Sequence, residues 1–338
     1  MPLSCATEYY HLLYLLNFLF GFSVQCSQIF VPLVAKQVGG SDLQVGLVVS
    51  LYGSAFLISS LLSGWLSDSN GRLLFVRIGL LAACMAFGGQ LVASSLSLLM
   101  ITRAIAGVAV GVATPALIAY AYESGTDVGK FSSYACLGWI AGAGAAAFLK
   151  TFTCCSFASC LSCLLAFCIS LVPKEIFSRK SPIVANVWLT LGRNYHVYLG
   201  VFLRYVGAYA VWAILPVYFV SLGLDELWIG LLWGLNFATQ FVVMPQLHRF
   251  RSRDLFLVGQ LLSICTFVGL AYAKGRFGLM GVQVLGGVGG SCLYVGALLA
   301  VLETGEEHGT ASGVFQSTLN LCGSLGPLLG GAVSALWG

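Results

Sequence analysis

The sequence predicts an all-α polytopic membrane protein made of two pseudo-symmetric six-helix bundles, with about eleven transmembrane helices present. The first observation behind this is composition: 59% of the residues are hydrophobic, 8% are charged, and the mean hydropathy is +0.93. The second is the recurrence of apolar runs of about 18 residues or more, the length that crosses the hydrocarbon core of a bilayer. The third is an internal repeat of roughly 180 residues. Together these observations exclude a soluble globular fold.

Eleven apolar runs are predicted to span the membrane. Their approximate bounds are 12–34, 43–66, 73–94, 96–121, 131–149, 155–172, 197–220, 227–247, 255–273, 277–301 and 310–336. We expect the first six to form an N-terminal bundle over residues 1–172, and the last five (helices 7–11) to form a C-terminal bundle over 196–338. The polar stretch 173–195 is the predicted linker between them.

The two halves are related by nearly constant shifts along the sequence. A shift of 181 places residues 64–72 on 245–253, and a shift of 180 places Glu123 on Glu303. A parallel repeat of this kind in an apolar chain is typical of a two-bundle transporter. Shifted by 180, the sixth run would have its counterpart at 335–352, whereas the sequence ends at residue 338. We therefore expect the twelfth helix to be absent.

The distribution of basic residues predicts a cytoplasmic N-terminus, because Lys and Arg accumulate in cytoplasmic loops. In that orientation four basic residues are external, namely Lys36, Lys150, Lys274 and Arg276. Ten are cytoplasmic: Arg72, Arg77, Lys130, Lys174, Arg179, Lys180, Arg193, Arg249, Arg251 and Arg253. We expect a multi-pass protein of the plasma membrane, surrounded by lipid. The net charge of +4 follows from this topology and does not indicate a nucleic-acid partner.

A polar, turn-rich segment between the second and third runs reads Gly64-Trp-Leu-Ser-Asp68-Ser-Asn-Gly71-Arg72. It resembles the G-x-L-x-D-x-x-G-R motif of the major facilitator superfamily, and with the repeat this resemblance covers nearly the whole chain. The resemblance implies a fold of two bundles and transport by alternating access, with these four residues as a gating motif. It also implies that Asp68 lies near the start of the eleventh helix, where backbone N–H groups favour negative charge, and latches the outward-facing state.

The second copy of this segment, at 245–253, has lost both glycines and carries Arg249 in place of Asp68. We therefore expect an asymmetric latch. Glu123 and Glu303 end the fourth and tenth helices, and we expect each to form a gate ion pair, with Arg72 and Arg253 respectively. The alternative for these charges is an ordinary interfacial position.

Two arginines lie inside predicted membrane spans. Arg103, Gly107 and Gly111 resemble an R-x-x-x-G-x-x-x-G element of the same family, in which the arginine is implicated in coupling. The alternative for Arg103 is snorkelling to the membrane surface. Arg204 lies near mid-depth of the seventh helix, and the face that follows carries an aromatic series of Tyr205, Tyr209 and Trp212. We interpret this face as a cavity wall, and the two buried cations as a sign of an anionic or electron-rich substrate.

Amide side chains recur at helical spacing in three of the apolar runs. They are Asn17, Gln25, Gln28, Asn236, Gln240, Gln316 and Asn320. By the family resemblance, these helices line the central cavity, so the amides are candidate substrate-binding residues. Hydrogen bonding between helices is an equally good explanation for each of them.

The eleventh helix contains Gly326, Pro327, Gly330 and Gly331, which resemble an element that drug antiporters carry in helix five. Helix five of this chain lacks the proline and the final glycine pair. Close helix packing through small residues is the alternative, both here and for the glycines of the fourth helix.

These observations favour a secondary active transporter that moves a small organic solute, with efflux of amphipathic or drug-like compounds as the leading interpretation. Uptake or exchange of an anionic metabolite is one alternative, and a non-transporting receptor or truncated, inactive carrier is another. An enzyme is not expected, because no set of acid, base or metal-ligating residues converges and no Walker-type loop is present. We expect no metal and no cofactor, a proton as a candidate coupling ion, and a monomeric protein.

Overall fold

The structure is a computed structural model that describes residues 4–174, 186–273 and 275–337. This part of the chain contains thirteen α-helices, one 3-10 helix and no strand. The helices are α1 (Ser4–Gln28), α2 (Val31–Gln37), α3 (Asp42–Asn70), α4 (Arg72–Gln90), α5 (Leu96–Glu123), α6 (Val128–Leu149), α7 (Phe152–Ser170), α8 (Val187–Arg193), α9 (Tyr195–Ser221), α10 (Glu226–Val243), η1 (Met244–Arg249), α11 (Ser252–Tyr272), α12 (Gly275–Leu302) and α13 (His308–Trp337). The predicted all-α class is confirmed.

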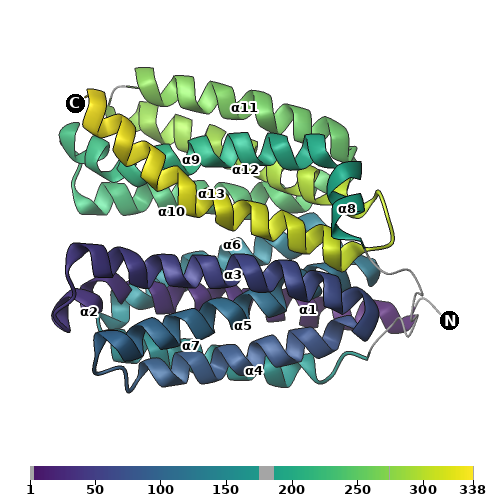
Figure 1. Cartoon of the computed structure of the whole chain (residues 1–338). Coiled ribbons are helices and arrows are strands. Elements are labelled where there is room, and N and C mark those ends of the chain that lie inside the picture. The colour runs from purple at the N-terminus through teal and green to yellow at the C-terminus, as the bar shows by residue number, and fades with distance from the viewer. Residues whose placement is uncertain (1–3, 175–185, 274, 338) are drawn as a thin grey trace.

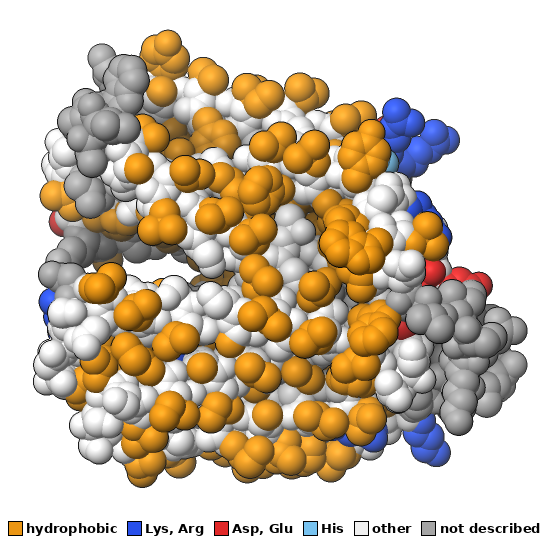
Figure 2. Space-filling model, viewed as in Figure 1, with side chains coloured by type: hydrophobic (Ala, Val, Ile, Leu, Met, Phe, Trp, Pro, Cys, Tyr) orange, Lys and Arg blue, Asp and Glu red, His pale blue; other side chains and the backbone are white. Residues whose placement is uncertain are grey.

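Ten helical segments within the described ranges are long and apolar enough to cross a membrane, judged by length and composition. The eleventh predicted run, 310–336, corresponds to α13, which is not among these ten. Many large apolar side chains on the outer surface are exposed, as expected where a helix bundle faces lipid (Figure 2).

The helices are arranged in two bundles that lie one above the other (Figure 1). Helices α1 to α7, in purple to teal, form the lower bundle, and α9 to α13, in green to yellow, form the upper one. The bundles contact each other mainly where α3 and α5 meet α13 and where α6 meets α10 and η1. Of the predicted linker 173–195, residues 175–185 lie outside the described residues, and the remainder includes the short helix α8.

Local sequence signals fix the ends of the helices that build the site. Helix α3 begins with a capping box, in which Ser41 Oγ accepts the N–H of Gln44 and Gln44 Oε1 accepts the N–H of Ser41. Gly71 separates α3 from α4 with φ of +92°, a conformation that favours glycine because it has no Cβ. The sharp turn at Gly71 brings the start of α4 back beside the end of α3.

The two ends of the molecule differ. Charged side chains gather at the end where α3 finishes and α13 begins, and there the bundles close on each other (Figure 2). We call this the charged end. Toward the opposite end, which carries α2 and the connection between α9 and α10, the space-filling view shows a hollow between the bundles. We call this the open end.

Candidate functional site

The charged end is closed by a crossing of α3 and α13 at which the two backbones touch. A methyl group added at Gly64 would overlap the carbonyl oxygen of Gly309 and lie 2.9 Å from the Cα of Gly313. One turn before Gly64 in α3 and one turn after Gly313 in α13, the Ser60 and Ser317 hydroxyl oxygens are 2.8 Å apart. The first glycine of the motif is therefore needed at this position for close approach between the bundles.

Asp68 binds the first turn of α13. Its Oδ1 accepts the N–H of Gly309 at 3.0 Å, and its Oδ2 accepts the N–H of Thr310 at 2.9 Å and the Thr310 hydroxyl. The first N–H groups of a helix have no partner within the helix and carry partial positive charge. The carboxylate on one bundle thus caps a helix of the other.

Arg72 joins two acids of the lower bundle. Its Nη2 lies 2.6 Å from Asp68 Oδ1 and 2.7 Å from Glu123 Oε1, and its Nη1 donates to Ser67 Oγ at 2.9 Å. The side chains of Asp68 and Arg72 are each 7% exposed, and that of Glu123 is 15% exposed. Gly71 positions this arginine, because the turn there starts α4 at Arg72. The arrangement holds Asp68 in the orientation that faces α13.

His308 completes the cluster from the other bundle. It is the first residue of α13, and its Nδ1 lies 2.9 Å from Glu123 Oε1, while its ring meets the edge of Tyr122 at 4.9 Å between centroids. This histidine is not among the site residues predicted from the sequence. His308 lies just before the predicted start of the eleventh helix, where Asp68 is expected to lie, and this position is the sequence signal that could have identified it.

A second crossing joins α6 to η1, at the position that the repeat relates to the first. A methyl group at Gly129 would overlap the carbonyl oxygen of Met244. Asp127 caps α6 by accepting the N–H of Lys130 at 2.9 Å, and its Oδ2 lies 3.4 Å from Nδ1 of His248. Asp127 and His248 were also absent from the predicted site.

The expected ion pair of Arg253 with Glu303 does not form. Glu303 Oε2 instead accepts a hydrogen bond from Ser252 Oγ at 2.6 Å, and Arg253 makes no ion pair within the described part of the chain. The physical reason is local: η1 ends at Arg249 and α11 starts at Ser252, which places the serine against the glutamate.

Arg103 is enclosed in the lower bundle. Its side chain is only 2% exposed, and its guanidinium carbon lies 4.3 Å from the centre of the Tyr52 ring. Its Nε and Nη1 have no hydrogen-bond partner in the described residues. Gly107 and Gly111 lie on the same helix, where an added methyl group would collide with the backbone of α3. The structure therefore places Arg103 in the interior and does not support snorkelling.

Arg204 lies at one end of a row of aromatic side chains in the upper bundle. Its Nε donates to Ser263 Oγ at 3.1 Å, and its guanidinium carbon lies 4.6 Å from the Tyr205 ring and 5.6 Å from the Trp212 ring. Arg204 Nη1 has no partner among the described residues. Tyr209 lies 5.2 Å from Trp212, so all three predicted aromatic residues belong to one cluster.

The aromatic row continues into the lower bundle through residues that sequence reasoning missed. Trp212 contacts Trp233 at 6.1 Å, Trp233 contacts Phe237 at 6.4 Å, and Phe237 contacts Trp139 of α6 at 5.8 Å between ring centroids. Because Trp139 and Phe237 belong to opposite bundles, this contact must change if the bundles move relative to each other.

The candidate amides of the lower bundle bond locally. Asn17 Nδ2 donates to the carbonyl oxygen of Phe131 at 2.7 Å, which joins α1 to α6. Gln28 Nε2 donates to Gln25 Oε1 at 3.1 Å, within α1. For Asn17 these contacts favour the interhelical hydrogen bond over solute binding.

The amides of the upper bundle form two groups. Asn236 Nδ2 donates to Gln283 Oε1 at 3.2 Å and Gln240 Nε2 donates to Asn236 Oδ1 at 2.8 Å. Gln240 Oε1 also accepts from Cys136 Sγ of α6 at 3.7 Å, so this group reaches the other bundle. In the second group, Gln316 Nε2 donates to the Tyr294 hydroxyl at 3.2 Å, and Asn320 Nδ2 donates to the carbonyl oxygen of Gln316 at 2.9 Å.

The glycine–proline element of α13 lies against α9. An added methyl group at Gly326 would come 2.5 Å from Cβ of Tyr209, and one at Gly330 would overlap the carbonyl oxygen of Ala210. Gly331 faces open space, and Pro327 lies inside the helix. At Gly326 and Gly330 the geometry matches the packing interpretation.

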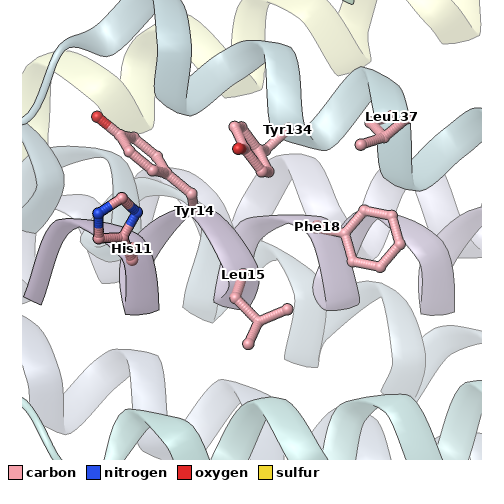
Figure 3. A pocket seen from close by; sticks show the side chains of 6 residues that line it. All are labelled: His11, Tyr14, Leu15, Phe18, Tyr134 and Leu137. Carbon is pink, nitrogen blue, oxygen red and sulfur yellow. The ribbon is translucent and has the colours of Figure 1, made fainter.

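A shallow groove of about 200 Å³ lies on the flank of α1 and α6 (Figure 3). It is lined by His11, Tyr14, Leu15, Phe18, Tyr134 and Leu137. The Tyr14 and Tyr134 rings stack at 5.1 Å, and the lining is mainly apolar. The groove contains none of the predicted substrate-binding residues.

Comparison with known proteins places these features in context. A family model described as Major Facilitator Superfamily matches residues 13–183 and 197–338. The quinolone resistance protein NorA of Staphylococcus aureus is 24% identical over 332 residues, which cover 90% of this chain and 84% of NorA.

Three solved structures share the fold over nearly the whole chain. The human organic anion transporter MFSD10 (TETRAN) has a TM-score of 0.78 at 14% identity, covering 100% of this chain and 95% of its own. The E. coli fucose:proton symporter FucP has a TM-score of 0.80 at 16% identity, with coverages of 98% and 93%. The proton:xylose symporter XylE has a TM-score of 0.76 at 17% identity, with coverages of 99% and 90%.

Proposed function

Because this chain belongs to the major facilitator superfamily of membrane transporters, we propose that it exports amphipathic or drug-like organic solutes by alternating access. The single observation that carries alternating access is the contrast between the two ends: the bundles are closed at the charged end and parted at the open end (Figure 2). A solute site between two bundles becomes accessible from each side in turn when the bundles rock against each other.

The charged end is assigned to the cytoplasm in this proposal. Of the basic loop residues that the structure describes, eight fall on this side and three on the other, and cytoplasmic loops are enriched in Lys and Arg. With that assignment the structure is an outward-facing state. Asp68, Arg72 and Glu123 then act as the latch of that state, because their contacts with the first turn of α13 exist only while the charged end is closed.

Efflux of drug-like compounds is supported by two observations. The similarity to NorA extends over most of both chains, and that protein is described as a quinolone resistance protein. In addition, the aromatic row from Tyr209 to Trp139 crosses from one bundle to the other beside the amides Asn236 and Gln240. Aromatic faces with a few amides suit flat, amphipathic solutes, because they offer stacking and hydrogen bonds without requiring a fixed charge.

Transport of an organic anion is a second candidate function, and a specific observation favours it. Arg103 is buried and Arg204 is half-buried, and both guanidinium groups keep buried N–H donors without a hydrogen-bond partner in the described ranges. A buried cation with free donors can bind a carboxylate or sulfonate. The human structural relative MFSD10 is described as an organic anion transporter.

A proton is the coupling ion that we propose. Two of the structural relatives are described as proton symporters. The carboxylates identified in the site, Asp68 and Glu123, lie at the charged end rather than at mid-depth. Proton binding at this end would therefore act on closure of the bundles rather than directly on the solute.

Flux measurements in proteoliposomes test the proposal. The protein is assayed with a panel of amphipathic cations, neutral compounds and organic anions, with and without an imposed pH gradient. Asp68→Asn weakens the contact with α13, and we expect it to reduce gradient-driven flux by about tenfold or more, because charge-assisted hydrogen bonds are roughly twice as strong as neutral ones.

Asp225→Asn is the matched control. Asp225 caps α10 at the open end, and asparagine caps helices as well as aspartate does. Flux that survives in Asp225→Asn and falls in Asp68→Asn supports a gated carrier, and the panel identifies the solute class. Absence of flux for every solute in the unmodified protein would overturn the proposal in favour of a receptor or inactive carrier.

A further inference from the structure

Two histidine–carboxylate pairs bridge the bundles at the charged end. At the first crossing, His308 of the upper bundle lies 2.9 Å from Glu123 of the lower bundle. At the second, His248 of the upper bundle lies 3.4 Å from Asp127 of the lower bundle. Because each pair joins opposite bundles, each can persist only while the charged end is closed. Histidine changes charge between about pH 5 and 8, the range of cellular pH.

The His308 pair is the more enclosed of the two. The side chains of His308 and Glu123 are 19% and 15% exposed, whereas His248 is 52% exposed. Water screens a contact less when it is more enclosed, so protonation of His308 has the larger effect on closure.

The three charged residues that bond to one another beside His308 carry an unbalanced charge of one unit. Asp68 and Glu123 carry two negative charges, and Arg72 carries one positive charge, which leaves a net charge of −1 when His308 is neutral. Protonated His308 brings the cluster to neutrality. Tyr122 also faces the imidazole, with its ring edge-on at 4.9 Å, and adds no charge as a neutral phenol. Outside this group, Glu307 pairs with Arg193 at 3.5 Å, so these two charges cancel, and Glu303 and Glu306 are exposed.

The start of α13 opposes this effect in part. A helix N-terminus carries partial positive charge, which disfavours a cation on its first residue. Here that end is already capped by the carboxylate of Asp68, and Glu123 lies within hydrogen-bond distance of the imidazole. A full negative charge at 2.9 Å outweighs half a positive charge that a second carboxylate neutralises.

We propose that His308 and Glu123 form a proton-binding site that strengthens closure of the charged end, so that acidity on that side favours the outward-open arrangement. The proposal rests on the proposed function in one respect, namely that the protein alternates between two arrangements. In the other arrangement the bundles part at the charged end and His308 loses Glu123. A ligand that binds one state more tightly shifts the population toward that state, and here the ligand is the proton.

The test measures the arrangement directly, in the full chain in lipid nanodiscs. Spin labels are placed at Gln37 and Ser221, which are exposed residues at the open end of opposite bundles. The labels are attached to non-canonical amino acids, because the chain has 12 cysteines that would also react with a thiol label. When the pH is lowered from about 8 to 5.5, we expect the ratio of long to short distances between the two labels to rise about threefold to tenfold. An effect of this size is expected because protonation adds a charge to one hydrogen bond.

His308→Gln keeps a donor for Glu123 and cannot be protonated, so we expect this variant to lose most of the pH response, leaving only the smaller contribution of His248. His308→Asn serves as a second non-titrating variant if the first folds poorly. His196→Gln is the control, because His196 is exposed at the start of α9 and contacts only Tyr195 among the described rings; it should keep the full pH response.

Two results would overturn the assignment: distances that do not respond to pH in the unmodified protein, or a full response that persists in His308→Gln. In the second case, loss of the response in His248→Gln would move the site to the other crossing. Because the distances are measured without solute, a protein that transports nothing but responds to pH refutes the proposed function alone. A protein that transports but does not respond refutes the proton site alone.

Discussion

The two crossings at the charged end occupy related positions in the sequence repeat but are built differently. At α3 and α13, Gly64 meets Gly309, and Asp68 accepts backbone N–H groups across the interface. At α6 and η1, only Gly129 allows close approach, and the residue that stands in the place of Asp68 is Arg249. The repeat therefore preserves the close approach at both places and the acid-to-backbone latch at only one.

The helices that enter the two crossings differ as well. Helix α3 stays α-helical to Asn70 and turns at Gly71, whereas the end of α10 tightens into the 3-10 helix η1, which contains Pro245. This tightening shifts the residues that follow, and Ser252 faces Glu303 where the repeat would place Arg253. We therefore expect the first crossing to carry most of the free energy that holds the charged end closed.

The largest expected effect on flux is the difference between substitution of Arg72 and substitution of Arg253. Arg72→Gln leaves Asp68 and Glu123 without their cation, and breaking a buried charge network costs about 3–5 kcal/mol. We expect flux to fall by at least about tenfold. Arg253→Gln removes a cation that makes no ion pair within the described residues, and flux should stay within about twofold of the unmodified protein. Equal losses in the two variants would contradict the asymmetry between the crossings.

The second prediction concerns close approach. Gly64→Ala places a methyl group against Gly309, and overpacking of this kind costs about 1–3 kcal/mol. The closed state should lose population, which shortens the distance between labels at Gln37 and Ser221. Gly46→Ala is the control on the same helix, because an added methyl group there has no neighbour within 4 Å. A shortened distance in both variants would show that helix propensity, rather than the crossing, is responsible.

The smallest expected effect lies at the second crossing. Asp127→Asn keeps the cap of α6 but removes the charge that faces His248. Because both side chains are substantially exposed, the loss should be below about 1 kcal/mol, within a few-fold of normal flux. Flux is measured for Asp127→Asn and Asp68→Asn in the same assay, and the two losses are compared. A larger loss in Asp127→Asn than in Asp68→Asn would reverse the assignment of the latch.

Sequence reasoning reached the fold and part of the site. Hydropathy and the repeat predicted a multi-span all-α protein, because long apolar runs leave few other structures in a membrane. The motif resemblance led to Asp68 beside α13, since a family pattern carries tertiary information that composition lacks. The pairing of Arg72 with Glu123 followed from both being placed at the same membrane face.

The remaining parts of the site depend on packing that no local pattern encodes. His308 is a single residue at a helix start, and only the crossing angle of two distant helices brings it to Glu123. Asn17 could have faced a cavity or a neighbouring helix, and the contact with Phe131 decides this. Trp139 and Phe237 meet across the bundles, where neither sequence segment reveals its partner.

Asp68 binds the main chain of α13 at Gly309 and Thr310, and this has a consequence for how the protein tolerates sequence change. A side-chain partner can be lost through many substitutions, but a peptide N–H is present in every residue except proline. At Gly309 an added methyl group would overlap Arg72, Gly64 and Ser67, so packing fixes that residue. At Thr310, by contrast, substitution leaves the N–H donor in place. Proline, which fits the first turn of a helix, is the one replacement there that would erase a donor while sparing the helix.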